Sequence, residues 1–234
     1  MDSALKGSIY TILFFFTSEL LYKLYRKVKD SRHVKSESES NMYSRKQETT
    51  SNCSSLKVLF FPDSKIACRD HFITGNGCYK DICAYSHSDT ALSELYKHML
   101  ACKSTLDVCV FVVTCKDLAD VLARLFRRGV KVRIITDKEQ LQASGSQIWT
   151  LMKDGIPVRT NDSSYLMHHK FALIDGKVLI NGSFNWTRQA ITGNQENLII
   201  TDDSSVTQLF MREFQKLWEQ YDPKNIVAGF LPKP

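Results

Sequence analysis

Several features that would assign a chain to a class at once are missing from this sequence. It has no internal repeat, and its seven cysteines are an odd number without regular spacing. A disulfide-stapled secreted fold is therefore not expected, and a reducing compartment is the simpler interpretation. Charge of one sign is not in large excess either, since the formal net charge is +6. That excess suits an anionic partner such as nucleic acid or an acidic lipid but does not require one.

The overall composition is that of an ordinary globular protein. Of the 234 residues, 43% are hydrophobic and 24% are charged. A chain of this length and balance can bury a real core. We expect one domain of good size with additional segments.

No apolar run in the chain is both long and uninterrupted. The stretch 9–16 is strongly apolar, but Glu19 and Lys23 interrupt the residues after it. The segment is about long enough to cross a hydrocarbon core of roughly 30 Å. We interpret residues 1–30 as an N-terminal membrane anchor whose basic flank keeps the rest of the chain in the cytosol. An amphipathic helix lying on a membrane surface is the alternative.

The rest of the chain divides by composition. Residues 31–55 are polar and aperiodic and are expected to form a flexible linker, and residues 224–234 a short tail. Between them, residues 56–223 alternate strand and helix patterns. Strands are predicted at 57–61, 106–114, 130–136, 156–160, 172–175, 178–181 and 198–201, and helices at 90–102, 117–128, 147–153 and 206–221. The Asp175-Gly176 dipeptide predicts a hairpin between the strands at 172–175 and 178–181. The alternation of strands and helices predicts an α/β fold.

The chemistry is concentrated in one pattern, His168-x-Lys170-x4-Asp175-x6-Gly182-Ser183-x-Asn185. A neutral imidazole can attack phosphorus, which makes His168 a candidate nucleophile. Lys170, Ser183 and Asn185 can donate to the oxygens of a phosphodiester, where negative charge builds up. A second histidine must protonate the leaving oxygen and activate water. His169 is the weaker candidate, because on a strand it points away from its two neighbours.

A second pattern has the residue types of a metal site. Cys68, Cys78, Cys83 and His87 follow one another at the short spacings of a CCCH zinc finger. Three thiolates and an imidazole suit tetrahedral Zn²⁺, and four protein ligands make the metal structural. Scattered buried cysteines with a surface histidine are the alternative. We therefore predict a zinc finger at residues 68–87, inserted after the first strand.

The first pattern resembles the HKD motif of the phospholipase D superfamily. The resemblance implies a mixed sheet flanked by helices, catalysis without a metal, and two motifs in each active site. Because this chain has one motif, it implies a homodimer with His168 of each subunit at the shared site. By position, His168, Lys170 and Asp175 match the motif, and Ser183 and Asn185 match the polar pair after it. Glu196 resembles the acidic residue that orients the histidine, with a surface charge beside a strand as the alternative.

The anchor, linker, zinc finger and single motif together resemble a mitochondrial branch of this superfamily. The resemblance implies an outer mitochondrial membrane location facing the cytosol and cleavage of single-stranded RNA in piRNA biogenesis. Hydrolysis of cardiolipin to phosphatidic acid is the alternative, and a non-catalytic scaffold is a second one. Basic residues that could follow an RNA backbone, or merely face solvent, are Arg124, Arg127, Arg128, Lys131, Arg133, Arg159 and Arg188.

Overall fold

The computed structural model describes residues 54–224. The predicted anchor at 1–30, nearly all of the predicted linker at 31–55 and the predicted tail lie outside the described residues. Within 54–224, no helix is long and apolar enough to cross a membrane.

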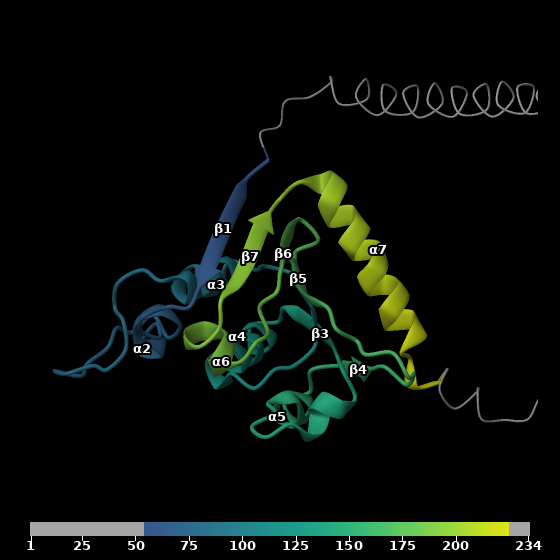
Figure 1. Cartoon of the computed structure of the whole chain (residues 1–234), viewed down its shortest axis with the longest axis horizontal. Coiled ribbons are helices and arrows are strands. Elements are labelled where there is room, and N and C mark those ends of the chain that lie inside the picture. Colours follow the sequence, from purple (N-terminus) through teal and green to yellow (C-terminus); the bar gives the residue numbers. More distant parts are fainter. Residues whose placement is uncertain (1–53, 225–234) are drawn as a thin grey trace, which may run out of the picture. The chain divides into compact units, whose positions relative to one another are not determined.

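A seven-stranded mixed sheet forms the centre of the described domain (Figure 1). The strand order is β1-β7-β6-β5-β2-β3-β4. β2, β3 and β4 are parallel to one another, and the remaining neighbours pair antiparallel. The strands are β1 (Leu56–Phe61), β2 (Thr105–Val110), β3 (Lys131–Thr136), β4 (Val158–Thr160), β5 (Lys170–Ile174), β6 (Val178–Gly182) and β7 (Glu196–Thr201). The predicted α/β class with a mixed sheet is confirmed.

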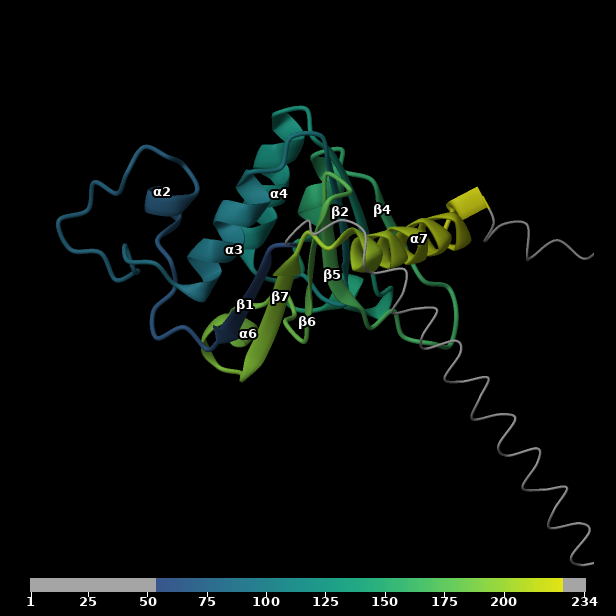
Figure 2. The ribbon, with the colours of Figure 1, turned by 90° about the horizontal axis from the view of Figure 1, so that it is seen from above.

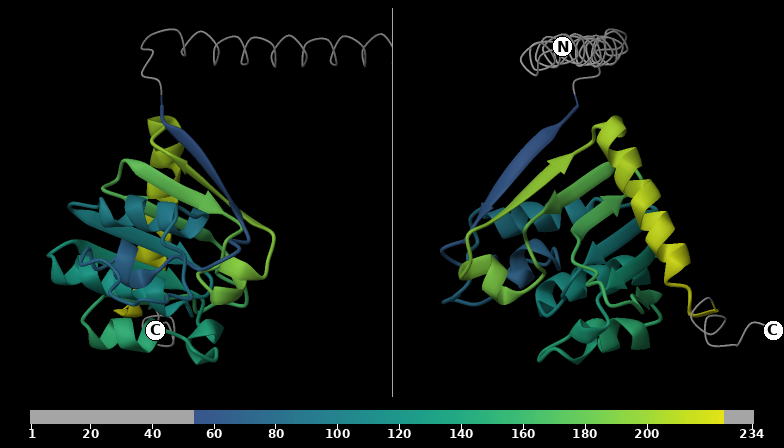
Figure 3. Two further views of the ribbon diagram at one scale, coloured as in Figure 1. Left: turned by 90° about the vertical axis from the view of Figure 1, so that its left-hand side faces the viewer. Right: turned by 45° about the vertical axis from the view of Figure 1, so that its right-hand side comes forward.

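Helices cover both faces of the sheet (Figure 2). α3 (Ala91–Leu100) and α4 (Lys116–Arg127) pack on one face and bury most of the core, while α7 (Ser204–Gln220) packs on the other face. Figure 3 shows α7 beside β5 and β6, with β1 at the margin of the sheet away from it. The short helices are α2 (Arg69–Phe72), α5 (Ile148–Lys153), α6 (Arg188–Thr192) and the 3-10 helix η1 (Glu139–Gln142).

Local sequence signals explain where the elements begin and end. Thr90 and Ser93 form a reciprocal capping box at the start of α3, and the Asp203 side chain caps α7. Asp175, Gly176 and Lys177 connect β5 to β6, and the first two have φ values of 53° and 63°. Positive φ angles at consecutive turn residues suit the twist of a hairpin. The hairpin predicted across these two residues is confirmed.

One predicted strand is longer than the strand observed. The apolar run predicts strand at 106–114, but β2 ends at Val110. From Phe111 onward the chain leaves the ladder: the Phe111 amide donates to the His169 carbonyl, and residues 112–115 bond to Trp186. The next residue after the predicted strand, Cys115, is the N-cap of α4, and its side chain is buried.

The strand directions define two opposite ends of the sheet. β1, β2, β3, β4 and β6 finish at the end where β5 and β7 begin. We call this end the His168 edge, because His168 lies directly before β5.

Candidate functional site

His168 and Lys170 form the centre of the candidate site. The Lys170 ammonium lies 3.0 Å from Nδ1 of His168 and donates to the His168 carbonyl oxygen at 2.7 Å. The His168 ring packs against Phe111, with ring centroids 4.6 Å apart. Burial lowers the pKa of Lys170, while the charge of Glu196 opposes that effect. A cation and an imidazole therefore face the same space at the His168 edge.

The pairing of β5, β6 and β7 brings Ser183 and Glu196 to this edge. Phe171 pairs with Asn181, so Lys170 and Gly182 reach the same end of the sheet. The Ser183 hydroxyl donates to Glu196 Oε2, and Asn194 donates to Oε1 at 3.0 Å. Gly182 is required here, because a Cβ atom at this position would lie 2.0 Å from the Asn197 carbonyl oxygen. Glu196 thus contacts Ser183 in the described structure rather than His168.

Asn185 is fixed through its neighbour Trp186. The Trp186 amide donates to the Val112 carbonyl at 3.2 Å. The Trp186 carbonyl accepts from the amides of Thr114 and Cys115 at 2.9 Å each. The side-chain oxygen of Asn185 is buried and has no hydrogen-bond partner within the described chain. Unpaired buried acceptors are rare and often mark functional positions.

The structure does not bring Asp175 to this group. Asp175 lies beyond the far end of β5, five residues from Lys170, which corresponds to about 16 Å along a strand. Its carboxylate accepts from the backbone amides of Lys103, Ser104 and Thr105. These bonds hold the pKa of Asp175 well below its usual range, against the effect of burial. The geometry gives this motif residue a structural role.

His169 points away from its neighbours, as the strand period predicts. Its ring meets Phe171 edge-on and lies 4.0 Å from Glu213 of α7. Burial lowers its pKa. His169 therefore belongs to the α7 face of the sheet rather than to the space beside Lys170.

The four predicted metal ligands come together. One ligand atom from each of Cys68, Cys78, Cys83 and His87 lies within 4.8 Å of the others. The Cys68 and Cys83 sulfurs are 3.8 Å apart. Two thiolates held tetrahedrally at about 2.3 Å from one Zn²⁺ lie about 3.8 Å apart, so the spacing fits a metal. His71 stacks on His87 at 5.0 Å and is outside this set of four. The cluster could hold a metal ion in a structural role.

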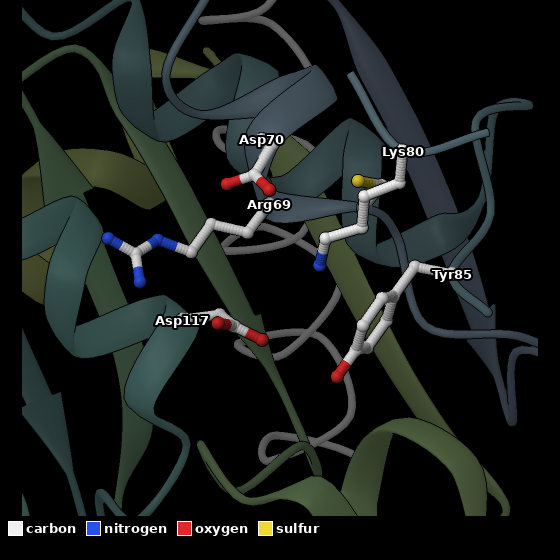
Figure 4. Close-up of a pocket in the computed structure, with 6 residues that line it drawn as sticks. Arg69, Asp70, Lys80, Tyr85 and Asp117 are labelled. Atoms are coloured by element: carbon white, nitrogen blue, oxygen red, sulfur yellow. The ribbon is translucent and has the colours of Figure 1, made fainter. Parts of the chain in front are cut away.

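The finger segment, residues 68–87, packs against the body of the domain. Ala67 and Ser86 form a bridge, and Arg69 pairs with Asp120 of α4 at 3.0 Å. A cavity of about 220 Å³ lies at this junction, lined by Cys68, Arg69, Asp70, Lys80, Tyr85 and Asp117. Figure 4 shows these side chains around it. Arg188, three residues after Asn185, lies 3.8 Å from Asp117 and hydrogen-bonds Tyr85. The finger and the His168 edge thus share side-chain contacts.

The basic residues around the end of α4 do not reach the His168 edge. Arg124, Arg127, Arg128 and Lys131 lie where α4 ends and β3 begins, which is the opposite end of the sheet. Arg133 forms a two-pronged pair with Asp107 at 2.7 and 2.8 Å, and Arg159 pairs with Asp222 at 2.7 Å. Arg188, by contrast, begins α6 three residues after Asn185.

Comparison with known proteins decides the family. The model of the family "Cardiolipin synthase, PLD-like domain" matches residues 95–218. The mitochondrial cardiolipin hydrolase of Chlamydomonas reinhardtii is 45% identical over 166 residues, covering 71% of this chain and 74% of the relative. This chain belongs to the phospholipase D-like family. Because the relatives at this identity are named cardiolipin hydrolases, the chain is a phosphodiesterase of this superfamily, as predicted.

Two further likenesses agree with this assignment. The mitochondrial cardiolipin hydrolase of Mus musculus is 42% identical over 174 residues, covering 71% of this chain and 77% of the relative. Among solved structures, the phospholipase D family member Nuc from Salmonella typhimurium superposes with a TM-score of 0.57 at 22% identity, covering 72% of this chain and 97% of that one. The second likeness supports the phospholipase D-like fold.

One contact of the site is not visible in the sequence pattern. Phe111 supports both central side chains, since the Lys170 ammonium also lies 5.2 Å from the centroid of its ring. Phe111 reads as one more apolar residue of the strand predicted at 106–114. Its position directly after the C-terminal end of β2, where functional side chains collect in α/β sheets, is the signal that could have identified it.

Proposed function

We propose that this chain is a phosphodiesterase in which His168 attacks phosphorus and carries a covalent phosphohistidine intermediate. The observation that carries the proposal is the contact between His168 and Lys170, at the same sheet edge as Ser183 and Glu196. The imidazole supplies the nucleophile and Lys170 the positive charge for the non-bridging oxygens. No step of this chemistry needs a metal, as is general in the family.

Two displacements complete the proposed reaction. In the first, a nitrogen of neutral His168 bonds to phosphorus, the bond from phosphorus to one ester oxygen breaks, and an acid protonates that oxygen as it leaves. In the second, water bonds to phosphorus, the phosphorus–nitrogen bond breaks, and the base takes the proton of water. The products are an alcohol and a phosphate monoester. One chain supplies one such imidazole at the His168 edge.

We therefore propose a homodimer in which His168 of the second subunit is the acid and base. An exposed apolar surface beside the His168 edge supports a second copy. Three apolar side chains lie on the same sheet face as α7, in the part that α7 does not cover. Val58, Phe60 and Ile199 are 43%, 73% and 40% exposed there. Phe60 pairs with Asn197, next to Glu196. Covering these side chains would bury apolar surface and close the site from solvent.

Single-stranded RNA is the substrate we propose first, with piRNA biogenesis as its context. The support comes from the finger segment, where Tyr79 is 87% exposed and lies next to the exposed Lys80. An exposed aromatic ring beside a cation suits stacking of an unpaired base and contact with its phosphate. Cleavage would leave the phosphate on the 5′ end of the product.

Cardiolipin is the second candidate substrate, and two observations favour it. The curated relatives carry the name mitochondrial cardiolipin hydrolase. Tyr165 and Leu166, just before His168, are 82% and 55% exposed and could enter the apolar region of a lipid surface. Hydrolysis of the ester bond between either phosphate and the central glycerol would give phosphatidic acid and phosphatidylglycerol.

We further propose zinc as the metal of the finger and the outer mitochondrial membrane as the location. Three thiolates and one imidazole are the donor set that zinc prefers in structural sites. The names of the relatives support mitochondria, and the apolar segment within residues 1–30 supports an anchor with the enzyme facing the cytosol.

Parallel assays with the two substrates test this function. Purified full-length protein is incubated with 5′-labelled single-stranded RNA and, separately, with cardiolipin vesicles. Each reaction is run with and without a chelator, which is added only briefly so that the finger keeps its metal. We expect RNA fragments with a 5′-phosphate, no requirement for added Mg²⁺, and no product from His168→Asn. Turnover of cardiolipin alone would select the second substrate. Cleavage that depends on added Mg²⁺, or that survives in His168→Asn, would contradict the proposed chemistry.

A further inference from the structure

Asp137 is a fully buried carboxylate that the phospholipase D motif does not include. It directly follows β3, at the His168 edge, and its side chain is 0% exposed. Among residues 54–224, the two groups that donate hydrogen bonds to its carboxylate are both backbone amides rather than cations. A carboxylate held out of water without a positive partner is costly, and such groups are concentrated where function needs them.

One amide belongs to the loop that leads into the candidate nucleophile, and the other belongs to the start of η1, the element that follows β3. Oδ2 of Asp137 accepts from the Met167 amide at 2.8 Å, and Oδ1 accepts from the Glu139 amide at 3.0 Å. Met167 is the residue before His168, and its own side chain is buried, with Sδ 3.4 Å from Sγ of Cys109. The backbone that leads into His168 is therefore fixed from two directions.

Asn161 repeats the arrangement one strand away. It directly follows β4, is 5% exposed, and lies beside Asp137 because β3 and β4 are parallel neighbours. Its Oδ1 accepts from the Lys138 amide at 2.8 Å, and its Nδ2 donates to the Tyr165 carbonyl at 2.9 Å. Together, the two side chains tie the 138–139 backbone to the 165–167 backbone.

Thr136 and Asp137 also hold the backbone of Phe111, whose ring contacts the His168 imidazole. The Phe111 carbonyl accepts from the Thr136 hydroxyl at 2.9 Å and from the Asp137 amide at 3.4 Å. The Phe111 amide donates to the His169 carbonyl at 2.8 Å. The imidazole itself is exposed, so its placement depends on this backbone scaffold and on its contact with Phe111.

We infer that Asp137 is a positioning residue, assisted by Asn161, that holds the backbone of His168 so that the imidazole is aligned for attack on phosphorus. The inference rests on the proposed function of His168. Its physical basis is that a nucleophile misplaced by about 1 Å can lose a factor of about 100 in rate. Binding of the substrate does not depend on Asp137, because its carboxylate is buried beneath the loop.

The test compares single-turnover rates with bis(4-nitrophenyl) phosphate as the probe. Asp137→Ala removes both acceptors, and Asp137→Asn keeps one. We expect the rate of 4-nitrophenol release in the first turnover to fall between about 10- and 100-fold in Asp137→Ala and by less in Asp137→Asn. KM should stay within about twofold of the unchanged protein. Circular dichroism at the assay temperature verifies that each variant is folded.

Asp203→Ala is the matched control for lost stability. Asp203 also accepts two backbone amides, from Ser205 at 2.8 Å and Val206 at 3.4 Å, but it lies at the start of α7, beyond the opposite end of the sheet. It should lower the melting temperature and leave the first-turnover rate unchanged. If Asp137→Ala does not fold, Asp137→Asn and Asn161→Ala decide the question by the same criterion.

The outcomes separate this inference from the proposed function. A folded Asp137→Ala protein that reacts within about twofold of the unchanged protein would overturn the positioning role. An equal loss in Asp203→Ala would also overturn it, since the effect would then follow stability alone. If the unchanged protein shows no first-turnover product that depends on His168, the proposed function itself fails.

Discussion

At the scale of single residues, the site depends on a lysine whose charge is easier to lose than usual. Burial lowers the pKa of Lys170, so its ammonium loses a proton at a lower pH than an exposed lysine with a pKa of about 10.4. We expect kcat/KM to fall on the alkaline side as Lys170 becomes neutral. Lys170→Arg should lower the maximum but move this decline to higher pH, because a guanidinium stays charged.

A pH series of kcat/KM from about 6 to about 10 measures this shift, with circular dichroism as the control for unfolding. An alkaline limb that is identical in the protein and in Lys170→Arg would show that another group titrates there.

Asp175 makes a residue-scale prediction about stability. Its pKa in the folded protein is lowered by its bonds to Lys103, Ser104 and Thr105. The unfolded chain binds the proton at a pKa of about 3.9, so the stabilisation is complete above that pH and is lost as the pH falls toward the folded pKa. Asp175→Asn should reduce the free energy of unfolding by about 2–4 kcal/mol at neutral pH and by less near pH 3, in urea titrations.

The control for this experiment is Asp154→Asn. Asp154 forms only an exposed pair with Arg127 at 3.8 Å, so its replacement should change stability by less than about 0.5 kcal/mol at either pH. If the Asp175→Asn protein is as stable as the unchanged protein but inactive, the structural role is wrong and Asp175 takes part in catalysis.

At the scale of elements, the finger segment is the part whose folding we expect to depend on a bound metal. Its one helix, α2, is four residues long, and most of its side chains are exposed. We expect about one zinc ion per purified chain, lost in Cys78→Ala together with a lower melting temperature. Elemental analysis of the purified proteins measures the metal. Cys102→Ala, a buried thiol outside the cluster, should keep its zinc, and equal metal content in Cys78→Ala would rule out this site.

The sequence predicts contacts within one element or hairpin better than contacts between distant elements. The strand period correctly separated His168 and Lys170 from His169, and the Asp175-Gly176 turn correctly paired β5 with β6. These are local relations. The roles of Asp137 and Asn161 could not be predicted, because each bonds a segment about 20 to 30 residues away that only the order of strands brings near. The strand predicted to continue through 111–114 was wrong for the same reason, because Val112 and Thr114 leave the sheet and hydrogen-bond Trp186.

At the scale of the whole molecule, the proposed chemistry requires two chains for one site. If each site needs His168 from both subunits, mixed dimers that contain one His168→Asn chain are inactive. In an equal mixture with free exchange of subunits, activity should then fall to about one quarter of the value for unmixed protein at the same total concentration. Independent subunits would retain about one half.

Co-expression of the two chains with different tags, followed by purification through both tags, isolates the mixed dimer directly. A mixed dimer of the unchanged chain with Arg127→Ala, a replacement at the opposite end of the sheet, should be fully active. Half activity in the His168→Asn mixed dimer would refute a shared site.

The most direct test of the central claim is mass spectrometry of the enzyme after the reaction is quenched during turnover. The peptide that contains His168 should carry the phosphoryl group with the retained part of the substrate, bonded to an imidazole nitrogen and stable in base but labile in acid. The adduct should be absent from His168→Asn. An enzyme that turns over phosphodiesters at full rate while this peptide stays unmodified at every quench time would contradict the proposed mechanism.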